Sequence, residues 1–138
     1  MKKLFAFIPV FFFFAAVCGG TAMAQEKMSL AGTWVGPAEI ATDDAFSTAT
    51  MTLVITEQQG RAFRGTVKFD EGTPFAVSGI FYGDKIRLTG SVSTFTGEIW
   101  FLGLNKIIVG SGSKLASENV GEMTVGFQLY WTGFGSNP

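Results

Sequence analysis

The stretch from Phe75 to Phe101 contains three consecutive segments of one pattern: FAVSGIF (75–81), KIRLTGSV (85–92) and FTGEIWF (95–101). Each segment combines aromatic or aliphatic residues with hydroxyl residues around one interior glycine, and in 85–92 apolar and polar positions alternate throughout. Alternation with a period of two is typical of a half-buried β-strand. Because the connections between the segments are very short, the stretch predicts an antiparallel meander.

The first 24 residues have the composition of a secretory leader. Lys2 and Lys3 precede an uncharged apolar run over residues 4–17, and small residues flank Met23 just before Gln25. This pattern predicts a signal peptide at 1–24 and a single β-barrel domain at 25–138, exported to the periplasm or secreted. A retained membrane anchor is the alternative, because the weakly polar residues that follow extend the segment to about the 20 residues of a spanning helix.

The only cysteine, Cys18, lies inside this leader. Lipidation there would require a small residue at the position of Val17, so loss of the cysteine with the leader is favoured. Cleavage before Gln25 then excludes disulfides, thiolate catalysis and cysteine metal sites. The sequence also lacks histidine, the usual general base near neutral pH and the commonest metal ligand. Ten basic and eleven acidic residues without a basic cluster argue against nucleic-acid binding.

Eight strands are predicted in the domain from alternation and turn signals. Their ranges are 32–41, 49–57, 62–70, 75–81, 85–92, 95–101, 106–114 and 122–131. A loop is predicted at residues 42–48, and Ser93-Thr94 is predicted to turn the fifth strand into the sixth. Strands joined by short loops alternate in direction, so the first and the eighth can pair antiparallel and close the sheet. The predicted fold is therefore an all-β, eight-stranded, antiparallel up-and-down barrel.

One face of these strands is apolar and carries several glycines, which let a narrow barrel coil tightly. The glycines expected on that face are Gly65, Gly79, Gly90 and Gly97. With the apolar face inward the barrel is soluble, whereas with that face outward it is an outer-membrane barrel with a polar lumen. The inward version is favoured, because the charged residues of the third, fifth and sixth strands then lie on a solvated wall.

Gly32-Thr33-Trp34 opens the first strand and resembles the start of calycin-type barrels, the lipocalins, fatty-acid-binding proteins and avidins. The resemblance implies that the tryptophan plugs one end of the barrel beneath a basic residue from the last strand. The segment 122–131 has no Arg or Lys, so that cap is missing or replaced. Val35 stands where biotin binders have Asn, so biotin binding is not implied. Periplasmic protease inhibitors and allene-oxide-type cyclases belong to the same structural neighbourhood.

The first candidate site is the barrel interior, which could bind a small apolar ligand. Its predicted inward set is Trp34, Leu53, Phe63, Val67, Phe75, Val77, Leu88, Ile99, Val109, Phe127 and Leu129. The same residues would equally form a filled core, since an eight-stranded barrel is just wide enough for its own side chains.

The second candidate site is on the outer wall. Ile80, Trp100 and Ile108 are expected to point outward from the fourth, sixth and seventh strands, where an exposed tryptophan flanked by isoleucines suggests a homo-oligomer contact. Single exposed apolar residues are also ordinary on protein surfaces.

No catalytic or metal-binding pattern is present in the sequence. Asp43 and Asp44 match no calcium loop and are interpreted as solvated loop residues. No cofactor is predicted, and a nucleophile paired with a base is missing, so the protein is not expected to be an enzyme. The expected function is that of an exported binding module for a small apolar ligand or a protein partner. The alternative is a structural or inhibitor-type periplasmic protein with a filled barrel.

Overall fold

The computed structural model describes residues 28–115 and 122–133, and these residues form eight β-strands. The predicted signal peptide at 1–24 lies outside the described residues. The strands are β1 (Gly32–Ala41), β2 (Phe46–Gln59), β3 (Ala62–Phe69), β4 (Phe75–Tyr82), β5 (Lys85–Gly90), β6 (Ser93–Leu102), β7 (Asn105–Leu115) and β8 (Glu122–Gly133). The described ranges contain no helix long and apolar enough to cross a bilayer.

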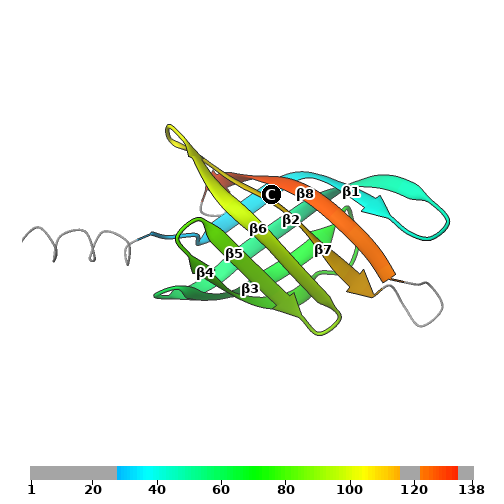
Figure 1. The fold of residues 1–138 in the computed structure, drawn as a ribbon. Helices are drawn as coiled ribbons and strands as arrows, with labels where there is room; N and C mark the ends of the chain where they lie inside the picture. The colour runs from blue at the N-terminus through cyan, green and yellow to red at the C-terminus, as the bar shows by residue number, and fades with distance from the viewer. Residues whose placement is uncertain (1–27, 116–121, 134–138) are drawn as a thin grey trace, which may run out of the picture.

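The eight strands form one closed barrel in which every neighbouring pair is antiparallel (Figure 1). β1 pairs with β2 on one side and with β8 on the other. The first and the last strand therefore have no free edge. The predicted all-β, eight-stranded antiparallel barrel is therefore confirmed. β1 begins at one end, which we call the N-terminal end, and the β2–β3, β4–β5 and β6–β7 turns lie there too. The opposite end, called the far end, carries the β1–β2, β3–β4 and β5–β6 connections.

The strand limits differ from the predicted ones at two connections. The predicted loop at 42–48 is wrong, because β2 begins at Phe46, which pairs with Ala41. A tight turn joins them, in which the amide of Thr42 donates to the carbonyl of Ala45 at 2.9 Å. The predicted turn at Ser93-Thr94 is also wrong, because β5 already ends at Gly90 and β6 begins at Ser93. Backbone pairing continues in both places beyond the apolar alternation that marked the strands in the sequence.

The core is the apolar inner face of the barrel, and it is continuous through all eight strands. The predicted inward orientation is wrong for Val109, which is 42% exposed on β7. Ile108 was expected to point outward but is completely buried and opposite Ile99. Residues 107–109 are an unbroken apolar run, so alternation alone did not decide which of them faces inward. The register is set by neighbouring strands, which place Gly110 and Gly112 opposite the inward Gly97 and Phe95.

Aromatic rings cover some of the glycines on the inner face. A Cβ on Gly79 would lie 2.2 Å from Cζ of Phe63, and one on Gly110 would lie 2.7 Å from Cζ of Phe127. Phe63 and Gly79 are direct cross-strand partners, so the ring occupies the volume that a side chain would need. Pairing a large aromatic side chain with a residue that has no side chain lets a narrow barrel fill its interior without strain.

Candidate functional site

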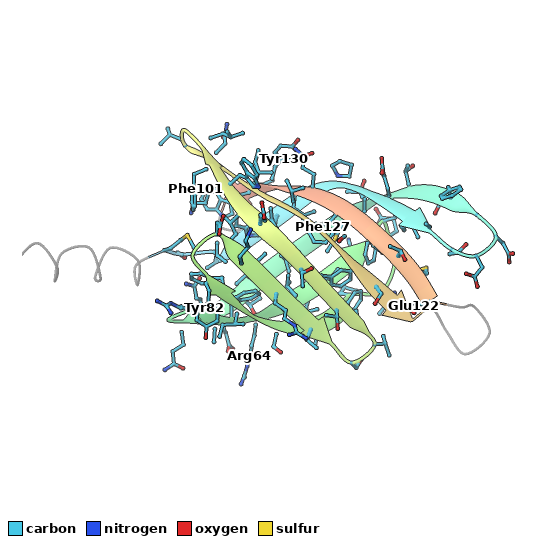
Figure 2. All side chains as sticks on the ribbon, viewed as in Figure 1. Arg64, Tyr82, Phe101, Glu122, Phe127 and Tyr130 are labelled. Carbon is cyan, nitrogen blue, oxygen red and sulfur yellow. The ribbon has the colours of Figure 1, made fainter. Side chains whose placement is uncertain are left out.

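Ten of the eleven residues predicted to line a ligand pocket point into the barrel, and most of these are completely enclosed. Nine of them are at most 5% exposed: Trp34, Leu53, Phe63, Val67, Val77, Leu88, Ile99, Phe127 and Leu129. Of the other two, Phe75 is only half-buried, and Val109 faces outward as described above. In the middle of the barrel Phe127, labelled in Figure 2, meets Phe95 edge-to-face with the ring centroids 5.9 Å apart. These side chains pack on one another as a core, with the rings seated over the interior glycines.

The N-terminal end of the barrel is closed by the segment that precedes β1. Leu30 is completely buried beneath Trp34, whose indole Nε1 donates to the Leu30 carbonyl at 2.9 Å. The amide of Leu30 donates to Oε1 of Gln58 at 2.7 Å, and Nε2 of Gln58 donates to the carbonyl of Met28 at 2.7 Å. Residues 28–31 are therefore held across this end by hydrogen bonds between their backbone groups and the side chains of Gln58 and Trp34. We call residues 28–31 the plug, and these bonds satisfy the buried amide of Leu30 and the buried indole N–H of Trp34.

A lysine completes this closure. The resemblance to calycin-type barrels implied a basic residue from the last strand, and β8 has none. Here Lys106 of β7 lies with its Nζ 4.7 Å from the ring centroid of Trp131 on β8, and it donates to the carbonyl of Ser29 at 3.1 Å. Trp131 in turn donates to the carbonyl of Ala31 at 3.1 Å. The cap is thus replaced by a lysine from the neighbouring strand.

The far end is less completely closed than the N-terminal end, because the inward-facing apolar residues nearest to its opening are only partly buried. Phe69 of β3 and Phe75 of β4 stack with their ring centroids 6.3 Å apart, and Ile40 of β1 packs on the same core. Lys114 of β7 reaches across the barrel to these rings, with its Nζ 4.9 Å from the centroid of Phe75 and 5.7 Å from that of Phe69. A cation is therefore placed at the apolar rim, in contact with two aromatic faces.

A buried hydroxyl adjoins this lysine. Ser93 is the direct cross-strand partner of Lys114, is only 6% exposed, and its Oγ has no hydrogen-bond partner in the described structure. A Cβ placed on Gly90 would lie 2.6 Å from this Oγ and 3.6 Å from the Phe75 ring, so the hydroxyl and the ring border the same small space. We refer to Phe69, Phe75, Ser93 and Lys114 as the far-end cluster.

Of this cluster, only Phe75 was in the pocket set predicted from the sequence. Ser93 was placed in a turn, and Lys114 was taken only as the last residue of the seventh strand. The available signal was the spacing of two between Lys114 and the glycines at 112 and 110, which puts Lys114 on the inner face.

Of the three residues predicted to point outward as an interface, only two do so. Trp100 is 53% exposed and Ile80 is 38% exposed, whereas Ile108 faces inward. Ile80 pairs with Arg87 of β5, so a charged strand separates it from Trp100. The structure therefore does not bring the three predicted interface residues together.

A different apolar set lies in register across four adjacent strands. Trp100 of β6 is opposite Ile107 of β7, Ile107 is opposite Tyr130 of β8, and Tyr130 is opposite Val35 of β1. We call these four residues the outer row. Figure 2 shows Tyr130 near the protruding β6–β7 hairpin, which also carries the exposed Phe101.

A shallow hollow also lies on the outer wall of β3, β4 and β5. It is lined by side chains that include Arg64, Ser78, Ile80, Arg87 and Thr89. All five of these side chains are exposed. Among the described residues, no group of three acidic, histidine or cysteine side chains is arranged to bind a metal ion.

Comparison with known proteins identifies similar barrels among solved structures. No family model matches the chain, and no curated protein matches it. The rhizavidin–biotin complex is 15% identical, with 79% of this chain and 100% of that chain covered and a TM-score of 0.45. The short afifavidin–biotin complex is 21% identical (80% and 96% covered, TM-score 0.45), and intact afifavidin in its apo form is 20% identical (85% and 93% covered, TM-score 0.46). The chain has the calycin-like barrel architecture that Gly32-Thr33-Trp34 led us to expect.

Proposed function

We propose that this protein is an exported binding module that takes a small, largely apolar ligand at the far end of its barrel. Export is supported by the leader-like composition of residues 1–24. Binding is favoured over catalysis because the chain has no histidine and its sequence pairs no nucleophile with a base.

The observation that carries this proposal is the difference between the two ends of the barrel. The N-terminal end is sealed by a buried leucine and a network of hydrogen bonds. At the far end, Ile40, Phe69 and Phe75 pack on the core but remain partly accessible. Apolar side chains beside a few polar groups are the usual lining of a ligand site. The filled middle of the barrel restricts the ligand to the rim, so a small molecule is favoured over a long one.

A neutral fluorescent probe tests this site directly. N-phenyl-1-naphthylamine should brighten when it binds the purified domain, and Phe75→Ser should abolish most of that signal because it removes an aromatic wall of the rim. Leu104→Ser is the matched control, since Leu104 is 97% exposed in the β6–β7 turn at the opposite, N-terminal end. Equal loss in both variants, or no brightening of the wild type, would refute the proposal.

Native mass spectrometry of protein purified from its own host provides a second test. A retained small molecule is the expected result. A spectrum that contains only the bare chain or a complex with another protein would favour the filled-barrel alternative.

A protein partner or a second copy of the chain is the other candidate for the binding function, and the outer row favours it. Trp100 and Tyr130 are 53% and 44% exposed on one wall, with the buried Ile107 between them. Tryptophan and tyrosine in one apolar row are the residues enriched at interface centres.

This interface is tested by the oligomeric state in solution. Light scattering during gel filtration should show an oligomer for the wild type and a monomer for Trp100→Glu. Val92→Glu is the control, because Val92 is similarly exposed at 43% but lies in the β5–β6 turn. An unchanged mass for Trp100→Glu would remove the outer row as a self-contact.

A further inference from the structure

The ammonium group of Lys114 occupies an unusual position for a charged side chain. It lies within 5.7 Å of the centroids of two phenylalanine rings at the inner rim of the barrel. In the ranges 28–115 and 122–133, the ion pairs involve Arg64 and Lys85 but not Lys114. Ring faces attract a cation but accept no strong hydrogen bond, so its three N–H donors are not satisfied by the cluster itself.

Ser93 adds a second unsatisfied group beside the same lysine. Its Oγ is buried and has no hydrogen-bond partner among the described residues, although a buried hydroxyl normally has one. Ser93 and Lys114 are paired across β6 and β7, and both side chains are on the inner face of their strands. Two hydrogen-bond donors therefore converge on one end of the barrel without an acceptor from the described part of the chain.

The ligand that complements these groups has an anionic head and an apolar body. A carboxylate has two oxygens, so it can accept from the ammonium group and from the hydroxyl at the same time. An apolar body attached to it would cover the exposed parts of Phe69 and Phe75 and bury them from water. A neutral alcohol would satisfy the same apolar surface but would leave the charge of Lys114 uncompensated.

We propose that the far-end cluster binds a small amphipathic carboxylate, whose head accepts hydrogen bonds from Nζ of Lys114 and Oγ of Ser93 while its apolar body packs on Phe69 and Phe75. This inference rests on the proposed ligand-binding function and names the chemical class of the ligand. The filled interior below the rim sets a limit on the length of the apolar body.

The test compares three probes that share one tail and differ in the charge of the head. Octanoate, octan-1-ol and octyltrimethylammonium are titrated into the purified domain by calorimetry. Octanoate should bind about tenfold or more tightly than octan-1-ol, which is the range expected for a charge-assisted hydrogen bond, and the cation should bind most weakly.

Variants then assign the preference to Lys114. Lys114→Met keeps the length of the side chain and should weaken octanoate binding by about tenfold to a hundredfold, while octan-1-ol binding stays the same. Lys114→Arg should restore most of the loss, and Ser93→Ala should weaken octanoate binding by a smaller factor. Lys68→Met is the matched control, because Lys68 is a partly exposed lysine of β3 outside the cluster, and it should change nothing. Thermal unfolding confirms that each variant is folded.

The outcomes separate the two proposals. Equal affinity for octanoate and octan-1-ol, or unchanged octanoate binding by Lys114→Met, overturns the carboxylate inference and leaves the apolar site standing. If none of the three probes binds, both the inference and the proposed small-ligand function fail. If Lys114→Met does not fold, the comparison of the three probes on the wild type still decides the question.

Discussion

Gly79→Ala is expected to destabilise the barrel, because the structure provides no room for even one methyl group at this position. A Cβ on Gly79 would lie 2.2 Å from Cζ of Phe63 and 2.6 Å from the backbone carbonyl oxygen of Arg87. The ring is 3% exposed and enclosed by the core, and the oxygen belongs to the β4–β5 ladder, so neither can move aside easily. Overpacking of this kind costs about 1–3 kcal/mol.

Thermal unfolding followed by circular dichroism measures this cost. For a domain of roughly 100 residues, about 1 kcal/mol shifts the melting temperature by about 4 °C, so Gly79→Ala should lower it by about 4–12 °C. Gly126→Ala is the matched control, since a Cβ on Gly126 meets no atom within 4 Å and its backbone is not left-handed. Alanine should be neutral there, or stabilise by about 0.5–1 kcal/mol, because a strand glycine loses more entropy on folding.

A double-mutant cycle identifies the ring as the cause. In a Phe63→Leu background the nearest ring atom is gone, so Gly79→Ala should cost about 1 kcal/mol less than it does in the wild type. The contact with the Arg87 oxygen remains and should account for the residual loss. Equal melting temperatures for Gly79→Ala and Gly126→Ala, or strict additivity with Phe63→Leu, would refute the idea that the Phe63 ring fills the space beside Gly79.

Two further predictions concern hydrogen bonds and charge. Gln58→Ala leaves the buried amide of Leu30 without its acceptor and should lower the free energy of unfolding, measured with denaturant, by about 1–3 kcal/mol. Gln59→Ala, at the exposed neighbouring position, should lower it little. Equal losses in the two variants would mean that the bond from Leu30 to Gln58 does not hold residues 28–31 in place. The hydrogen bond from Lys85 to Glu98 raises the pKa of Lys85 above its ordinary 10.5. A raised pKa means that the bond stabilises the fold below pH 10.5, and that this contribution is lost as the pH rises through the folded-state value. Glu98→Gln should therefore melt slightly below the wild type at neutral pH, and the gap should close in strong alkali and in 1 M salt; a gap that widens with pH would contradict this assignment.

Much of the fold follows from local sequence patterns. The segment 85–92 alternates with a period of two, and the short turns that join it to 75–81 and 95–101 favour antiparallel pairing of all three. The same alternation placed the predicted pocket residues inward, because a strand that is half-buried must direct every second side chain to the core. β7 is the exception, since the apolar run at 107–109 fits either register.

The candidate site was much less accessible from the sequence. Lys106 is not on the last strand, so nothing local predicted that it would lie on Trp131 and close the N-terminal end. Likewise, Lys114 contacts Phe69 and Phe75 across the barrel, although these residues precede it by about 40 positions in the chain. Such contacts depend on which strands become neighbours after closure and on how far each is shifted along the next.

The sequence by itself determined the number of strands, their alternating direction and the apolar character of one face, because these properties depend on residues near one another in the chain. Only the tertiary structure decided which end of the barrel is plugged, which wall carries the outer row, and that Lys114 and Ser93 share the far rim. The physical reason is that pairing of β1 with β8 fixes the stagger of all eight strands at once, and that stagger is a property of the closed barrel rather than of any single segment.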